Sequence, residues 1–221
     1  MNVTRNDVER IIDASLGATP APTLDQVSEF VKKTLDYNFA TTLTEPFFIK
    51  YNADILHAAG KQLVSVISYP LYGMTHEAKL AQAKQALADG ADELDVSMDI
   101  SAFKSGRFDY VKEDLKPFVD LMEGRIMKMI YGATLLTEDE QKHAAEIAIE
   151  LGIPFLKTNT GYGYVTTIEQ VKLIKDNFGD DIKVMVSGGV RTKEDAIAMI
   201  EAGAARIATS SPFKIVDSFN A

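Results

Sequence analysis

The sequence contains no cysteine and only three histidines among its 221 residues. The absence of cysteine excludes disulfides, thiolate zinc sites and thiol nucleophiles. A net charge of −9 argues against a broad nucleic-acid surface, because a polyanionic partner requires a basic footprint. Apolar runs stay short of the roughly eighteen residues that a membrane span requires, and no apolar signal segment opens the chain. We therefore expect a cytoplasmic enzyme that binds neither nucleic acid nor membrane.

The three histidines also argue against a metal site. His57, His76 and His143 lie in different helical or loop segments, and their spacing matches no metal-ligand pattern. We expect a solvated or capping role for each of them.

Short apolar or β-branched runs alternate with longer amphipathic segments, each time in the order strand then helix. Eight strands are predicted, over residues 10–15, 39–44, 62–68, 93–98, 125–131, 154–158, 183–187 and 206–209. Helical patterns cover residues 23–37, 75–89, 137–150, 166–178 and 192–202. Threonines begin these helices as N-caps, and Gly90, Gly152 and Gly203 end three of them.

The repeated strand–helix units predict a parallel sheet of the α/β class. Eight units in about this length favour a (β/α)₈ TIM barrel over an open doubly wound sheet. No linker or low-complexity tract interrupts the pattern, so a single barrel domain is predicted over residues 1–221.

Lys157 is the most informative residue, because it is a lone cation at the end of the apolar run from Ile153 to Leu156. Burying an unpaired ammonium is so costly that such a lysine is usually held for chemistry or by a partner charge. A lysine on a strand of this kind suggests a Schiff base.

Two further predicted strands each carry one charge between apolar neighbours, namely Asp95 and Lys128. Side-chain alternation lets each charge point into the barrel while its neighbours face the helices. One carboxylate, Asp95, and two lysines, Lys128 and Lys157, can therefore converge at the site. The alternative for each residue is a structural ion pair that fills the barrel, and this alternative is strongest for Lys128.

Small and hydroxyl residues follow the last two predicted strands. Gly188 and Gly189 come after the seventh strand, and Ser210 and Ser211 come after the eighth. Loops in these positions are the usual phosphate cradle of a barrel, because glycine lets backbone N–H groups approach the phosphate oxygens. Ordinary turn chemistry is the alternative, but the pairing of the two loops favours a local phosphate site.

Five segments occur in a characteristic order and spacing: 90–95 (GADELD), 102–106 (AFKSG), 155–161 (FLKTNTG), 187–196 (SGGVRTKEDA) and 202–211 (AGAARIATSS). Together they resemble the signature of the deoxyribose-phosphate aldolase family, and the resemblance runs through nearly the whole chain. It implies a class I aldolase, which uses a lysine iminium as its electron sink and needs neither a metal nor an organic cofactor.

The resemblance also implies roles for individual residues and a substrate class. Lys157 stands at the Schiff-base position, Asp95 at that of the acid/base carboxylate, and Lys128 matches a further lysine of the family. The substrate is expected to be a phosphorylated sugar, 2-deoxy-D-ribose 5-phosphate, cleaved reversibly to acetaldehyde and D-glyceraldehyde 3-phosphate. Its phosphate is expected among five residues, Gly161, Gly188, Gly189, Ser210 and Ser211.

Four positions depart from the family pattern. Met185 stands where the family usually carries a second active-site lysine. Tyr162 replaces a lysine, residues 131–133 replace a segment with a glutamate, and Ala14 replaces a histidine or another polar residue. We expect these changes to cluster around the pocket and to alter substrate preference or weaken activity.

The missing lysine matters because a nucleophilic amine must be neutral near neutral pH. A neighbouring ammonium or desolvation lowers the pKa of such an amine. Lys128, or Lys183 one alternation deeper on the strand of Met185, are the candidates to replace the missing charge.

Other polar residues are expected to have structural roles. Asp92 and Glu93 start a strand, so capping or pairing at the bottom rim of the barrel is expected for them. Tyrosines are frequent in the predicted strand-end loops and are candidates only for lining the pocket: Tyr69, Tyr72, Tyr131, Tyr162 and Tyr164.

Three functions remain open at this point. The first is deoxyribose-phosphate aldolase activity, and the second is the same lysine chemistry on another phosphorylated sugar or keto acid. The third is a sugar-phosphate-binding protein without catalysis. The sequence leaves the oligomeric state open, and a homo-oligomer is compatible with it.

Overall fold

Eight parallel strands, paired in chain order, close into a barrel in the computed structural model, which describes residues 3–17 and 19–220. Strand β1 pairs with both β2 and β8, and this last pairing closes the sheet. The strands are β1 (Ile12–Ser15), β2 (Thr41–Thr44), β3 (Leu63–Ile67), β4 (Glu93–Ser97), β5 (Met127–Ile130), β6 (Phe155–Lys157), β7 (Lys183–Ser187) and β8 (Ala204–Thr209). The predicted (β/α)₈ barrel is confirmed, with a strand at every expected position.

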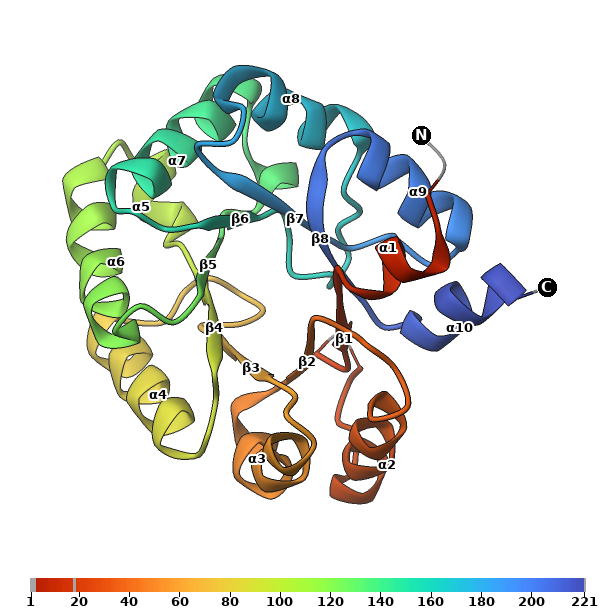
Figure 1. Cartoon of the computed structure of the whole chain (residues 1–221). Coiled ribbons are helices and arrows are strands. Elements are labelled where there is room, and N and C mark those ends of the chain that lie inside the picture. Colours follow the sequence, from red (N-terminus) through yellow and green to blue (C-terminus); the bar gives the residue numbers. More distant parts are fainter. Residues whose placement is uncertain (1–2, 18, 221) are drawn as a thin grey trace.

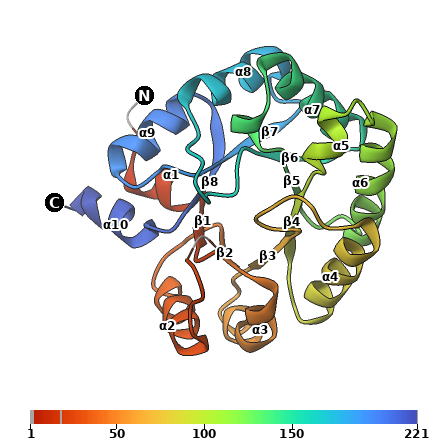
Figure 2. The same ribbon diagram turned by 180° about the vertical axis from the view of Figure 1, so that it is seen from behind.

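Helices surround the strands on all sides (Figure 1), and the same ring is visible from behind (Figure 2). The α-helices are α1 (Arg5–Glu9), α2 (Leu24–Thr34), α3 (Ile49–Ala58), α4 (His76–Ala88), α5 (Ile100–Lys104), α6 (Phe108–Met122), α7 (Glu138–Glu150), α8 (Ile168–Phe178), α9 (Lys193–Glu201) and α10 (Pro212–Asp217). Short 3₁₀ turns occur at η1 (Pro46–Phe48), η2 (Ala133–Leu135) and η3 (Ser218–Asn220). Among the described residues, no helix is long and apolar enough to cross a membrane.

Threonine capping boxes set the starts of several helices. Thr23, Thr137 and Thr192 each accept a hydrogen bond from the backbone N–H three residues on, at the starts of α2, α7 and α9. The helix predicted from Thr166 begins one residue later than expected. Thr167 caps α8, whereas the buried Thr166 hydroxyl donates to the Ser187 carbonyl at 2.7 Å and is held by the barrel instead.

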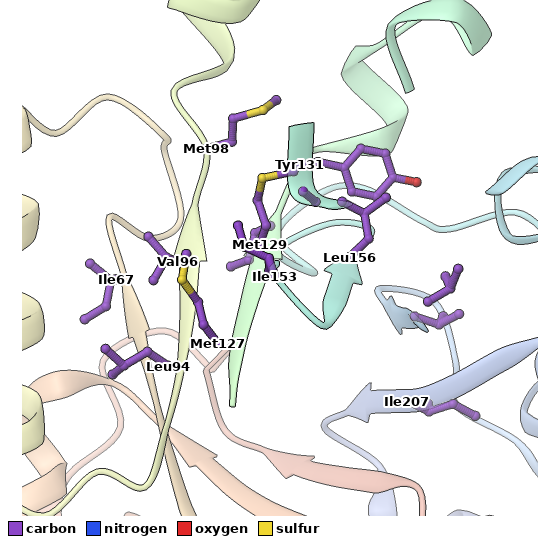
Figure 3. Close-up of a cluster of buried hydrophobic side chains, with 14 of the residues drawn as sticks. Ile67, Leu94, Val96, Met98, Met127, Met129, Tyr131, Ile153, Leu156 and Ile207 are labelled. Atoms are coloured by element: carbon purple, nitrogen blue, oxygen red, sulfur yellow. The ribbon is translucent and has the colours of Figure 1, made fainter. Parts of the chain in front are cut away.

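The apolar residues beside the charged strand positions form the core between barrel and helices. Figure 3 shows this cluster, in which Leu94, Met129 and Leu156 are fully buried. Helix residues Leu115 and Phe118 belong to the same core. Each such side chain contributes about 1.5–3 kcal/mol when buried. Next to the charged positions of β4, β5 and β6, the apolar residues therefore face the helices and the charged residues point inward, as the alternation predicts.

A buried ion pair joins α4 to α6 within this outer core. Lys79 Nζ pairs with Asp114, and both side chains are at most 2% exposed. His76 Nδ1 lies 2.9 Å from the other carboxylate oxygen of Asp114, and the Phe118 ring packs beside Lys79. Breaking such a pair leaves one charge buried without its partner.

Asp114→Ala is therefore expected to lower the free energy of unfolding by about 3–5 kcal/mol, because the Lys79 ammonium stays buried and unpaired. Urea unfolding measures this loss. The matched control is Asp120→Ala on the same helix. Its partner Lys116 lies 3.1 Å away and both side chains are exposed, so a loss below about 0.5 kcal/mol is expected. Equal losses in the two variants would contradict the prediction.

Candidate active site

Asp95 lies between two lysines on neighbouring strands inside the barrel. Lys157 Nζ donates to Asp95 Oδ2 at 2.6 Å, and Lys128 Nζ donates to Asp95 Oδ1 at 2.9 Å. All three side chains are at most 2% exposed. The three residues lie on β4, β5 and β6, which are adjacent in the barrel. The predicted convergence of one carboxylate and two lysines is thus what the strand order produces.

Lys128 has further carboxylate partners at a deeper level of the barrel. Its Nζ lies 2.6 Å from Glu93 Oε2 and 3.2 Å from Asp13 Oδ2. Arg206 on β8 closes the network, with hydrogen bonds to Glu93 at 2.9 and 3.2 Å and to Asp13 at 3.1 Å. Lys128 is therefore held by three carboxylates, whereas Asp95 is the carboxylate that contacts Lys157.

The buried charges shift the pKa values of their neighbours. Burial raises the pKa of Asp95, but the charges of Lys128 and Lys157 outweigh burial and hold that pKa below its ordinary value. Burial lowers the pKa of Lys128, but its three carboxylate partners outweigh burial and raise the pKa overall. Asp95 is therefore a carboxylate and Lys128 an ammonium at neutral pH.

The position of the missing second lysine lies directly beside Lys157. Met185 is the neighbour of Lys157 across the β6–β7 pairing, and its fully buried side chain packs with Phe155 and Ala208. A neutral thioether thus occupies the place of a cation. Lys183 does not replace it, because its exposed side chain starts β7, with the ammonium over the Phe155 ring at 5.5 Å. The expectation that Lys183 supplies the missing positive charge is therefore wrong.

A polar cavity of about 130 Å³ opens where the strands end. Four of the five residues expected around a phosphate line it: Gly161, Gly188, Gly189 and Ser210. Ser211 instead precedes α10, and its N–H donates to the Thr209 hydroxyl at 3.0 Å. The cavity is further lined by Ser15, Thr160, Ser187, Val190, Arg191, Ala208 and Thr209.

The two glycines after β7 are required by close contacts. Gly188 and Gly189 adopt φ of 97° and 94°, which side-chain-bearing residues rarely do. A Cβ at Gly188 would lie 2.3 Å from the Tyr164 carbonyl oxygen, and one at Gly189 would lie 2.5 Å from Val165 Cγ1. The Gly-Gly pair therefore lets the loop after β6 pack against the loop after β7.

Two of the four departures from the family pattern point away from the pocket. Ala14 and Tyr131 are fully buried in the outer core, and the Tyr131 hydroxyl lies 3.5 Å from Gln141 Oε1 on α7. The expected clustering of changes around the pocket is therefore wrong for these positions. It holds for Met185, beside Lys157, and for Tyr162, in the turn that follows Gly161 at the cavity.

Asp92 and Glu93 take different positions at the start of β4. Asp92 accepts the Leu63 N–H at 2.8 Å and lies 2.9 Å from His57 Nε2, in agreement with the capping or pairing expected of it. Glu93 makes the expected pairing, with Lys128 and Arg206, but it is 1% exposed and lies inside the barrel beneath Lys128 instead of at the rim. Glu93 thus belongs to the interior charge network.

The mouth of the barrel holds Tyr69, which the sequence offered only as a candidate for lining the pocket, and Glu45, to which the sequence assigned no role. Tyr69, after β3, donates its hydroxyl to the Thr160 carbonyl at 2.5 Å and packs edge-on against Tyr162, with ring centroids 5.7 Å apart. Glu45, directly after β2, is half-buried, and burial raises its pKa. Both residues follow the end of a strand, and polar residues at this position of a barrel often belong to the active site. This position was the sequence feature that could have identified them.

An amine in contact with a carboxylate, inside a (β/α)₈ barrel with a polar cavity at the strand ends, is the set of groups that carbon–carbon cleavage through an imine requires. The fold and site thus define a barrel aldolase.

Comparison with known proteins identifies the family. The DeoC/LacD family aldolase pattern matches residues 26–210. Deoxyribose-phosphate aldolase of Staphylococcus carnosus is 38% identical, covering 95% of this chain and 96% of its own. Deoxyribose-phosphate aldolase 2 of Staphylococcus aureus is 38% identical, covering 96% of each chain.

Solved structures agree. A structure described as QR15, an aldolase, has a TM-score of 0.92 at 39% identity and covers 97% of this chain and 96% of its own. The deoxyribose phosphate aldolase of Aeropyrum pernix, described as tetrameric, has a TM-score of 0.91 at 28% identity and covers 99% of this chain and 93% of its own. The chain belongs to the DeoC/LacD aldolase family, and it is an aldehyde-lyase of the class I aldolase type.

The lowered pKa of Asp95 makes its contribution to stability depend on pH. With the folded pKa below the ordinary value of 3.8, the pairing of Asp95 stabilises the fold above that pH, and this stabilisation is lost as pH falls through the folded value. Asp95→Asn should cost about 3–5 kcal/mol of unfolding free energy near neutral pH, and the deficit should shrink at acid pH. Urea unfolding of both proteins across acid pH tests this, and a deficit independent of pH would contradict it.

Proposed function

We propose that the chain cleaves 2-deoxy-D-ribose 5-phosphate reversibly to acetaldehyde and D-glyceraldehyde 3-phosphate, with Lys157 as the Schiff-base nucleophile. The observation that carries this proposal is the 2.6 Å contact between Lys157 Nζ and Asp95 Oδ2 inside the barrel. It puts an amine and a proton carrier at one place. The relatives from Staphylococcus bear the name of this activity.

In the proposed first step, neutral Lys157 forms a C–N bond to C1 of the open-chain sugar. The electron pair of the C1 carbonyl moves to its oxygen, which takes a proton and gives a carbinolamine. Loss of water from this species gives a cationic iminium. Asp95 contacts Lys157 Nζ, so it is placed to accept the proton that nitrogen loses and to return a proton to the departing hydroxyl.

In the second step the bond between C2 and C3 breaks. The C3 hydroxyl loses its proton, its electrons form the carbonyl of glyceraldehyde 3-phosphate, and the C2–C3 pair moves into the iminium to give an enamine. Protonation of the enamine at C2 restores an iminium, and addition of water releases acetaldehyde and the free amine. Asp95 is the proposed carrier of these protons as well.

Lys128 has a positioning role in this proposal. Its ammonium fixes Asp95 Oδ1, so that Oδ2 stays directed to Lys157. The same charge keeps Asp95 ionised, as its lowered pKa requires. The sequence offered two interpretations of Lys128, a site residue and a member of a structural ion pair. The positioning role combines them, because the ion pair itself orients the catalytic carboxylate.

The substrate phosphate is proposed to lie in the cavity at Gly161, Gly188, Gly189 and Ser210, beside Ser211. The exposed Arg191 also lines this cavity and supplies a cation in a chain that is acidic overall. Phosphate binding at a distance from the C2–C3 bond orients the sugar and lets remote binding energy raise the rate.

Lys157→Ala is expected to abolish borohydride trapping of a substrate adduct and to lower the rate of cleavage to the limit of detection, because the amine is lost. Asp95→Asn should lower kcat about 10²–10⁴-fold, the usual contribution of a general acid–base group. Mass spectrometry locates the reduced adduct, and a coupled assay follows glyceraldehyde 3-phosphate. An adduct on Lys157 without cleavage of deoxyribose 5-phosphate would favour another phosphorylated sugar, and no adduct with any aldehyde would favour a binding protein.

Met185→Lys is expected to raise the cleavage rate near neutral pH, because a neighbouring ammonium favours the neutral form of the nucleophilic amine. Met185 is the cross-strand neighbour of Lys157, so the new charge would lie beside the reacting nitrogen. Met185→Leu is the matched control, since it changes packing without adding charge. Rates of both variants with deoxyribose 5-phosphate test this, and an unchanged or lower rate in a folded Met185→Lys protein would argue against a missing charge as the limit.

A further inference from the structure

One side chain, Tyr69, links the loop after β3 to the turn after β6 at the C-terminal ends of the strands. The Tyr69 ring packs against Leu43, Val64 and Val66, which belong to β2 and β3. Its hydroxyl reaches the Thr160 carbonyl, which lies three residues after Lys157. Because both ends of this bridge lie beyond the C-terminal ends of their strands, the bridge passes on the solvent side of Lys157.

The bridge lies close to the carboxylate. Val66, under the Tyr69 ring, is the neighbour of Asp95 across the β3–β4 pairing. Burial raises the pKa of Tyr69, and the charge of Asp95 contributes to the same shift. Lys157 and Asp95 are 2% and 0% exposed. Within the described residues, neither of them lines the phosphate cavity, to which the turn after β6 contributes Thr160 and Gly161.

We propose that Tyr69 is a positioning residue that covers the nucleophile. Its hydrogen bond to Thr160 holds the ring over the Lys157–Asp95 pair, opens to admit the aldehyde end of the substrate, and closes again over the iminium. Closure limits water at the cation until cleavage has occurred. The role in catalysis rests on the proposed Schiff-base function, whereas the covering of Lys157 is a property of the fold.

The attachment point gives this cover a link to the phosphate site. The Thr160 carbonyl directly precedes Gly161, which lines the cavity, so the turn that would hold the phosphate also holds the Tyr69 hydroxyl. Tyr162 in the same turn packs edge-on against the Tyr69 ring, with an interplanar angle of 72°. Binding at the turn and closure at the nucleophile therefore involve the same short segment.

The cover is tested through the accessibility of one amine. Formaldehyde with cyanoborohydride methylates any reachable neutral lysine, whether or not the protein is an active aldolase, and mass spectrometry gives the rate at Lys157. In Tyr69→Phe this rate is expected to rise about fivefold, which corresponds to about 1 kcal/mol, the net value of one neutral hydrogen bond. Tyr69→Ala removes the ring as well and should give a larger rise.

The controls separate access from unfolding. The exposed Lys183 should be methylated at the same rate in all proteins and serves as the internal reference. Tyr110→Phe on the outer surface of α6, where the side chain is 39% exposed, should leave the Lys157 rate unchanged. Urea unfolding of each variant shows that a higher rate at Lys157 does not come from a loosened fold.

Kinetics test the role in the reaction. With deoxyribose 5-phosphate, Tyr69→Phe is expected to lower kcat while KM, set largely by the phosphate end, stays close to that of the parent. Equal methylation of Lys157 in the parent, Tyr69→Phe and Tyr69→Ala would overturn the cover. If Lys157 is methylated faster in the Tyr69 variants but the parent protein does not cleave deoxyribose 5-phosphate, the covering role of Tyr69 is upheld and the proposed function is refuted.

Discussion

The double pairing of Asp95 is the interaction on which the interior of this barrel depends. A fully buried carboxylate is tolerated only when its oxygens are paired, and here each oxygen meets a different lysine. The arrangement also distinguishes the two lysines. Lys128 contacts three carboxylates and is fixed as a cation, whereas Asp95 is the carboxylate that Lys157 contacts. The same carboxylate thus stabilises the fold on one side and faces the reacting nitrogen on the other.

The alternation of side chains along each strand separates the apolar core between strands and helices from the charged network inside the barrel. Outward residues such as Leu94 and Met129 pack against the helices and supply the apolar core. Inward charged residues build a network that Arg206 closes at its deep end, and the polar cavity lies at the strand ends. Rigid strands therefore carry the reacting groups, and the loops carry the groups that meet the substrate. This division lets loop residues such as Tyr162 change while the lysine and the carboxylate stay in register.

The sequence predicted the strand–helix order and the meeting of Asp95, Lys128 and Lys157 from periodicities of two and 3.6 residues. It predicted a closed barrel from the presence of eight strand–helix units in a chain of this length. It did not predict which charges pair. Glu93 was expected at the rim, and its place beneath Lys128 depends on the stagger between strands, which a single strand pattern does not contain. Lys183 was expected near the nucleophile, but one alternation along a strand moves a side chain to another level of the barrel.

The net charge of the buried network depends on the state of Lys157. In the described part of the chain, the connected network holds three carboxylates, Asp13, Glu93 and Asp95, and three cationic side chains, Lys128, Arg206 and Lys157. A neutral amine at Lys157 leaves this group one negative charge in excess, and an iminium at the same nitrogen restores electroneutrality. The carboxylates of the barrel thus favour a cation at this nitrogen, whether ammonium or iminium, over the free amine.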